Sequence, residues 1–126
     1  MQRLKRRAEF LRARNGVRAS RGCVMIEAFR RPDQAGARIG FTATRRIGAA
    51  VVRNRAKRRL REAARAILEP IARADVDYVL IARPGLAEAA WERLLDDLSA
   101  ALLRLHTQIH GRDQVSGPTA GDGPPV

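Results

Sequence analysis

The chain has 126 residues, enough for one domain with a modest hydrophobic core and too few for two. Its net charge of +12 and isoelectric point of about 11.6 favour a polyanionic partner, with nucleic acid ahead of an anionic membrane surface. The single Cys23 excludes an internal disulfide and is typical of a reducing cytoplasm. No apolar run approaches the roughly 20 residues of a membrane span, and no signal-peptide core follows the basic N-terminus.

The first predicted element is a short basic helix over residues 2–14, with Leu4, Ala8 and Leu11 on one side. Phe10 lies off that side and has two interpretations. Composition favours a core residue, whereas its basic surroundings would suit a stacking platform for an unpaired base. Asn15-Gly16 then ends the helix.

Two strands are predicted next, over residues 22–29 and 38–44, joined by a turn over residues 30–37 that contains Pro-Asp and Gly. The first strand should direct Val24, Ile26 and Ala28 to one face. The second should place Ile39, Phe41 and Ala43 on one face, and small polar residues on the other: Arg38, Gly40, Thr42 and Thr44. Cys23 is interpreted as a small buried residue, because no histidine arrangement supports a nucleophile.

A strongly basic helix is predicted next. From Arg45 to Arg61 there are eight basic residues and no acid. Its apolar stripe comprises Val52, Ala56, Leu60, Ala63 and Ile67. One flank collects Arg53, Asn54, Lys57 and Arg61, and the other Arg55 and Arg59. Glu69-Pro70 ends the helix. Such a charge density without acids favours a surface that meets an anionic partner over a merely solvated face.

The remaining chain is predicted as a buried strand over residues 76–82, a turn over residues 83–85 and a long amphipathic helix over residues 88–109. Trp91 is interpreted as a core anchor at the start of this helix. Residues 111–126 have no periodic apolar content and are expected to form a disordered tail. The domain is therefore expected to span residues 1–110.

No catalytic or metal-binding constellation is apparent, so the predicted chemistry is binding. His106 and His110 are four residues apart but have no third ligand nearby, and they suit the C-terminal end of a helix better than a metal site. Glu92, Asp96 and Asp97 are interpreted as surface acids, paired with Arg93.

Several motifs together resemble the protein subunit of bacterial ribonuclease P. They are RIGF (residues 38–41), Arg45-Arg46, VVRNRAKRRLRE (residues 51–62), LKRRAEF (residues 4–10) and DYVLIAR (residues 77–83). The resemblance covers about residues 3–106. It implies an α/β sandwich, a single domain in the order α-β-β-β-α-β-α, with a left-handed βαβ crossover around the Arg-rich helix.

The resemblance also implies a function. Members of the family bind a catalytic RNA that removes the 5′ leader of precursor tRNA, using Mg²⁺ held mainly by the RNA. RNA-contact roles would fall to Arg45, Arg46, Arg53, Arg55 and Arg58. Leader-binding roles would fall to Phe10, Thr42, Asn54, Lys57 and Arg61. No catalytic residue, metal ligand, DNA partner or membrane partner is implied.

The chain departs from the family pattern at three positions: Arg14 and Ile26 stand where members often have aromatic residues, and Ala49 replaces a polar residue. Base stacking on the leader is therefore expected to be poorer, with more weight on arginine–phosphate contacts. Two alternatives remain: a ribosomal or general RNA-binding protein, and a stand-alone nuclease. The lack of a carboxylate or histidine constellation argues against the nuclease.

Overall fold

The computed structural model describes the backbone of residues 1–116 and the side chains of residues 1–110. The helices and strands are, in chain order, β1 (Gln2–Arg3), α1 (Arg7–Arg14), β2 (Val17–Arg21), β3 (Val24–Arg30), β4 (Arg38–Thr42), α2 (Ala50–Ile67), β5 (Val76–Ala82) and α3 (Trp91–Ser116). Three short 3₁₀ turns cover Arg45–Ile47, Glu69–Ile71 and Leu86–Glu88.

The strands form one mixed sheet in the order β1-β4-β5-β3-β2. β4 is parallel to both β1 and β5, whereas β3 is antiparallel to β2 and β5. The adjacent parallel strands β4 and β5 are joined through α2, which is the predicted basic helix. This connection is the expected βαβ crossover. The predicted mixed α/β fold and the order α-β-β-β-α-β-α are thus confirmed, with β1 added at the N-terminus.

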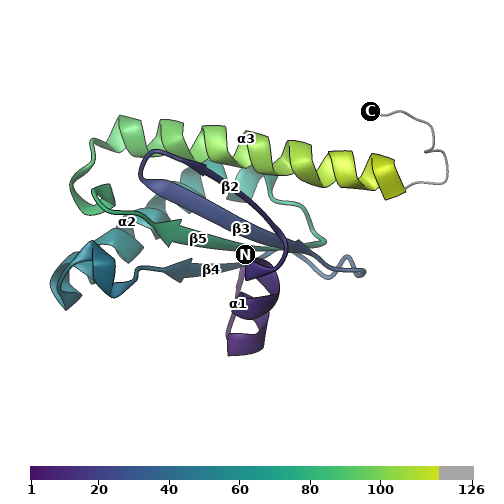
Figure 1. The fold of residues 1–126 in the computed structure, drawn as a ribbon, viewed down its shortest axis with the longest axis horizontal. Coiled ribbons are helices and arrows are strands. Elements are labelled where there is room, and N and C mark those ends of the chain that lie inside the picture. Colours follow the sequence, from purple (N-terminus) through teal and green to yellow (C-terminus); the bar gives the residue numbers. More distant parts are fainter. Residues whose placement is uncertain (117–126) are drawn as a thin grey trace.

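The helices cover both faces of the sheet: α3 lies on one face and α1 on the other (Figure 1). The main core lies under α3 and α2, where Ile26 of β3 and Tyr78 of β5 meet Leu60 and Leu98, all four fully buried. A smaller cluster on the opposite face joins Leu4, Ala13 and Val79. Successive residues of β5 thus face different clusters, with Tyr78 in the main core and Val79 in the smaller one. Because both faces of β5 are covered, its sequence is a continuous apolar run.

The predicted N-terminal helix begins too early. Gln2 and Arg3 form β1 beside β4, and the amide of Leu4 donates to the Ile39 carbonyl at 2.9 Å, so this segment is extended. The carboxylate of Glu9 then accepts from the amides of Lys5 and Arg6, before the first turn of α1. Helix α1 therefore buries Ala13, while Leu11 of the predicted apolar side is exposed.

Strand β2 was not recognised from its residues, although the family resemblance implied a third strand before the basic helix. Val17–Arg21 pairs antiparallel with β3, and its apolar residues Val17 and Ala19 are buried in the main core. Only two apolar residues alternate in this segment, which is too weak a pattern to identify a strand by itself.

The long last helix differs from the prediction at both ends. It begins at Trp91, after the 3₁₀ turn Leu86–Glu88, and it continues to Ser116, past the end expected at Ile109. The predicted disordered tail lies, from residue 117 onward, outside the described residues. Within the described part, no helix is both long and apolar enough to cross a membrane.

Candidate nucleic-acid interface

Helix α2 has the predicted apolar stripe, with Ala56, Leu60 and Ala63 fully buried and Val52 and Ile67 packed at its edges. The charged side chains therefore face outward. The side chains of most basic residues on and just before the helix make no hydrogen bond or ion pair with any residue of the described part. These are Arg45, Arg46, Arg55, Lys57, Arg58 and Arg61. Such unneutralised cations are the electrostatic footprint of a polyanion site.

Arg53, the first residue of the Arg-Asn-Arg motif, is an exception among the predicted RNA contacts. Its Nη1 donates to the Gly48 carbonyl at 3.0 Å, and its backbone amide bonds to the Ala49 carbonyl. Ala49 makes no side-chain cap. Arg53 thus ties down the start of a helix that has no capping side chain, and it is half-buried while Arg55 is exposed.

Arginines elsewhere are neutralised by a buried cluster that sequence reasoning missed. Asp77 on β5 is fully buried and pairs with Arg31 at 2.6 Å, with Arg38 at 2.8 Å and with Arg12 at 3.2 Å. Burial alone would raise the pKa of Asp77, but hydrogen bonds from Arg38 and Arg31 outweigh it and hold that pKa below its ordinary value. The sequence did contain a signal for this cluster: Asp77 is a carboxylate inside an apolar strand. A buried carboxylate requires a cationic partner.

The α1 face of the sheet brings together two predicted leader residues. Phe10 is half-buried against the small core cluster, and a Cβ built on Gly40 would lie 2.5 Å from its ring. Only glycine at this strand position lets the Phe10 ring lie on the sheet. Thr42 follows two residues later on β4, on the same face, and is half-buried. Phe10 therefore packs as the core interpretation requires, with part of its surface exposed.

The other predicted leader residues, Asn54, Lys57 and Arg61, share one flank of α2 by their spacing. Asn54 is exposed, and Lys57 and Arg61 are half-buried. Arg61 also lines a cavity of about 190 Å³ with Arg3 and Phe41, which the other four predicted leader residues do not line. The five residues thus form two subsets: Phe10 and Thr42 on the α1 face of the sheet, and the other three on α2.

Arg59 differs from the neighbouring cations on α2 because its side chain is engaged by other parts of the fold. Its guanidinium donates to the carbonyls of Leu86, Ala87 and Ala89 at 2.6–3.0 Å and lies 6.0 Å from the Trp91 ring centroid. The prediction of Trp91 as a core anchor is wrong: its side chain is 38% exposed, and it lies over Arg59. Arg59 instead joins α2 to the turn before α3.

His106 is half-buried, whereas His110 is exposed. The Nε2 atom of His106 lies 2.7 Å from the Tyr78 hydroxyl, which also accepts the Arg73 amide at 3.0 Å. Burial, with smaller contributions from Arg73 and His110, lowers the pKa of His106. Burial also raises the pKa of Tyr78 to about 12. His106 is therefore a neutral partner of a buried tyrosine. Within residues 1–110 no three His, Cys, Asp or Glu side chains are grouped to hold a metal.

Cys23 is buried, as predicted, but Asp97 is not the surface acid that was expected. Asp97 is 3% exposed and accepts from the amide of Cys23 at 3.1 Å. It also pairs with Arg93 at 3.5 Å, as anticipated. Burial and the neighbouring Asp97 raise the pKa of the Cys23 thiol, which makes it a poor nucleophile.

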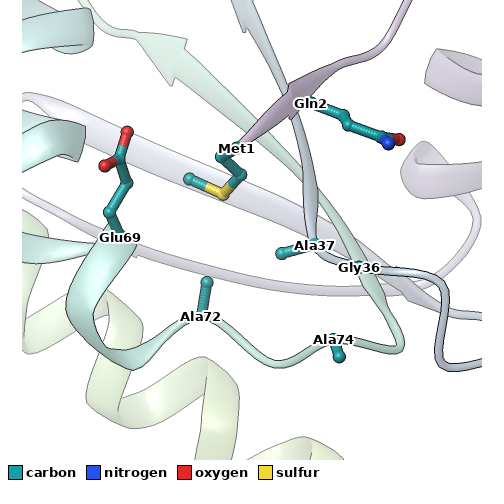
Figure 2. Close-up of a pocket in the computed structure, with 7 residues that line it drawn as sticks. All are labelled: Met1, Gln2, Gly36, Ala37, Glu69, Ala72 and Ala74. Atoms are coloured by element: carbon teal, nitrogen blue, oxygen red, sulfur yellow. The ribbon is translucent and has the colours of Figure 1, made fainter.

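A cavity of about 610 Å³ lies at the far end of α2, between β1 and the loop before β5 (Figure 2). Its walls are formed by Met1, Gln2, Gly36, Ala37, Glu69, Ala72 and Ala74. It contains no arginine and none of the predicted site residues. The cationic surface and this cavity are therefore separate features.

The fold, with a basic helix whose cations are mostly unpaired among the described residues, defines a small α/β protein suited to bind a polyanion. The family model described as Ribonuclease P matches residues 1–106, and the chain belongs to this family. It is 48% identical over 122 residues to the ribonuclease P protein component of Caulobacter vibrioides, covering 95% of this chain and 82% of that protein. The corresponding component of Ruegeria pomeroyi is 47% identical over 106 residues, covering 82% and 85%.

Solved structures show the same fold. The RNase P protein of Staphylococcus aureus has a TM-score of 0.69 at 22% identity, covering 82% of this chain and 94% of that chain. The RNase P protein of Thermotoga maritima has a TM-score of 0.66 at 24% identity, covering 85% and 97%.

Proposed function

We propose that this chain is the protein component of ribonuclease P, and that it binds the catalytic RNA and the 5′ leader of precursor tRNA while the RNA removes the leader. The observation that carries the proposal is the set of cations on and before α2 that have no partner among residues 1–110, in a chain of this family. Because the family's partner is RNA, the expected location is the cytoplasm.

The catalytic RNA is assigned to the cations that begin the basic region: Arg45, Arg46, Arg53, Arg55 and Arg58. Four of these side chains are exposed, and guanidinium groups make paired hydrogen bonds to phosphate oxygens. Arg53 contributes through the position that it gives to the helix start, as well as through its charge.

The leader is assigned to Phe10, Thr42, Asn54, Lys57 and Arg61. Phe10 offers the exposed part of its ring for stacking, Thr42 and Asn54 offer hydrogen bonds, and Lys57 and Arg61 offer charge. A single strand bound by stacking and phosphate contacts suits this composition. With Arg14 and Ile26 in place of aromatic residues, phosphate contacts carry more of the affinity here than stacking does.

The chemistry is assigned to the RNA, with Mg²⁺ held mainly by RNA phosphates. The buried acids Asp75, Asp77 and Asp97 are each engaged by arginines, so they are poorly suited to bind a cation. The protein's cations reduce repulsion between the catalytic RNA and its substrate.

The test is a reconstituted holoenzyme with Lys57→Ala or Arg61→Ala, and Arg104→Ala on α3 as the control. The two α2 variants should weaken binding of leader-bearing precursor much more than binding of mature tRNA, and the control should change neither. Each charged contact contributes roughly 1–3 kcal/mol. Equal losses for both RNAs would refute the leader assignment, and binding confined to ribosomal RNA would instead support a ribosomal protein.

A further inference from the structure

We propose that a pocket between β1, β4 and the C-terminal half of α2 binds a phosphate group of an RNA backbone. The proposal rests on the proposed function and adds one site to it, with Arg3 and Arg65 as residues to which no role was assigned above. The cavity has a volume of about 190 Å³. Its walls are Met1, Arg3, Ile39, Phe41, Arg61, Ala64, Arg65 and Glu69.

The backbone of the pocket is held by regular structure on both sides. Arg3 lies in β1, in register with Ile39 of β4, and the next amide bonds to the Ile39 carbonyl. On α2, Ala64 is buried between Arg61 and Arg65, and its small side chain leaves space against Phe41. The cavity therefore follows from strand pairing and from an alanine on the inner face of the helix.

The guanidinium of Arg3 makes no hydrogen bond or ion pair with the described residues. Its Cζ atom lies 5.0 Å from the centroid of the Phe41 ring. A cation–π contact uses the charge but none of the N–H groups. Arg3 can therefore donate to an anion while the ring limits where its guanidinium lies.

The helix supplies two further cations. Arg61 and Arg65 are one turn apart, so their side chains lie on the same face of α2. Arg61 has no polar partner among the described residues, and Arg65 pairs with Glu62 at 2.9 Å. Both members of that pair are more than half exposed, so the pair is weak. With Glu69 as the single carboxylate in the wall, three guanidinium groups leave the pocket cationic.

The size of the pocket fits one phosphate group and not several consecutive phosphates of an RNA strand. The neighbouring cavity shares Met1 and Glu69 with it, and Figure 2 shows these two side chains with Gln2, Gly36 and three alanines around the rest of that cavity. No arginine lines the neighbouring cavity. The cationic surface thus ends at Glu69, which would repel a second phosphate.

Two RNAs could supply the phosphate: the leader of the precursor, or the catalytic RNA. Arg61 is also assigned to the leader, which makes an upstream leader phosphate the simpler source. The shared chemistry is an RNA phosphodiester, and leader length separates the sources, because a leader too short to reach the pocket cannot gain from it.

The experiment uses the full chain reconstituted with catalytic RNA, and precursors whose leaders increase in length. Arg3→Ala and Arg65→Ala are compared with Arg7→Ala, an exposed arginine of the same basic N-terminal region that does not line the pocket. Arg3→Ala should lower affinity several-fold and reduce the salt slope by about 0.7 per lost single-strand phosphate contact. Arg3→Lys should recover part of the affinity.

A loss confined to the longer leaders assigns the phosphate to the leader, and a loss of affinity for the catalytic RNA alone assigns it to that RNA. Glu69→Gln should increase affinity, which gives a second readout should Arg3→Ala fold poorly. Phosphate binding by the pocket is refuted when the unchanged protein stimulates leader removal but the pocket variants have the same affinity as Arg7→Ala for every RNA tested. Failure of the unchanged protein to stimulate leader removal refutes the proposed function itself.

Discussion

Asp77 and Arg38 face each other across the parallel strands β5 and β4 and share two hydrogen bonds of 2.8 Å. A third nitrogen of Arg38 donates to the Glu9 carboxylate at 2.9 Å. Arg12 of α1 donates to the buried carboxylate of Asp77. Helix α1 has only 8 residues, fewer than an isolated helix needs to be stable. The Asp77 cluster therefore holds α1, and with it Phe10, against the sheet.

Replacing Asp77 with Asn should destabilise the fold by about 3–5 kcal/mol, because three arginines would lose their shared counter-charge. Asp96→Asn on the exposed side of α3 is the matched control and should have little effect. Urea unfolding at neutral pH measures both. Similar unfolding midpoints for the two variants would contradict a structural role for the cluster.

The same carboxylate predicts the direction of the pH dependence. The folded pKa of Asp77 lies below its unfolded value of about 4, so its stabilisation is fully present above that value and is lost as the pH falls through the folded pKa. Asp75, held by Arg30 and Arg73, acts in the same direction. Asp77→Asn should therefore weaken the fall in the free energy of unfolding at acidic pH. Part of that fall should remain, because Asp75 is unchanged.

Replacing Gly40 with Ala should impair leader binding more than stability. The added Cβ would lie 2.5 Å from the Phe10 ring, and the ring can move more easily than the strand. Precursor affinity should fall several-fold while the affinity for mature tRNA holds. Adding Phe10→Ala should cost little more, since both changes remove the same contact. Additive losses in that double-mutant cycle would show that Gly40 acts independently of Phe10.

The basic helix and the main core could be predicted because each depends on a periodic pattern along one segment. The stripe from Val52 to Ile67 and the alternation in β3 needed no knowledge of partners. The start of α1 could not be predicted, because Leu4 has helical spacing with Ala8 and Leu11, whereas residues 2–4 bond to β4, which is distant in sequence. Local propensity is overridden there by strand hydrogen bonds.

The concentration of arginines on and before α2 could be predicted from the sequence, but which of them are engaged by other parts of the fold could not. Arg55 and Arg59 are one turn apart and look equivalent in sequence. Only the packing of the turn before α3 shows that Arg59 is occupied by three carbonyls. Arg3 and Arg65 were likewise inconspicuous, since the pocket that they line requires β1 to be a strand.

The proposed difference between Arg55, which binds RNA, and Arg59, which stabilises the fold, can be tested with Arg55→Ala and Arg59→Ala. Arg59→Ala should lose about 1–3 kcal/mol of stability, because the carbonyls of Leu86, Ala87 and Ala89 lose a charged donor. Arg55→Ala should keep its unfolding midpoint but bind the catalytic RNA less tightly, with a shallower dependence on salt. The assignment is wrong if the two variants exchange these behaviours.

The last prediction concerns which molecule performs the hydrolysis. Cleavage of a phosphodiester requires a positioned nucleophile and stabilisation of the developing negative charge, commonly by metal ions held on carboxylates or phosphates. The buried acids of this chain are bound by arginines, and its exposed cations would repel free Mg²⁺. The protein alone should therefore leave precursor tRNA uncut at any Mg²⁺ concentration.

The catalytic RNA alone should cut slowly in high salt and high Mg²⁺, and adding protein should lower the Mg²⁺ that is required. A double variant, Arg55→Ala with Arg58→Ala, should shift this requirement back toward that of the RNA alone, because two exposed cations no longer screen the phosphates. Titration of Mg²⁺ against the cleavage rate, with Arg104→Ala as the control, measures the shift. Accurate removal of the leader by protein freed of RNA with nuclease would overturn the assignment of the chemistry to RNA.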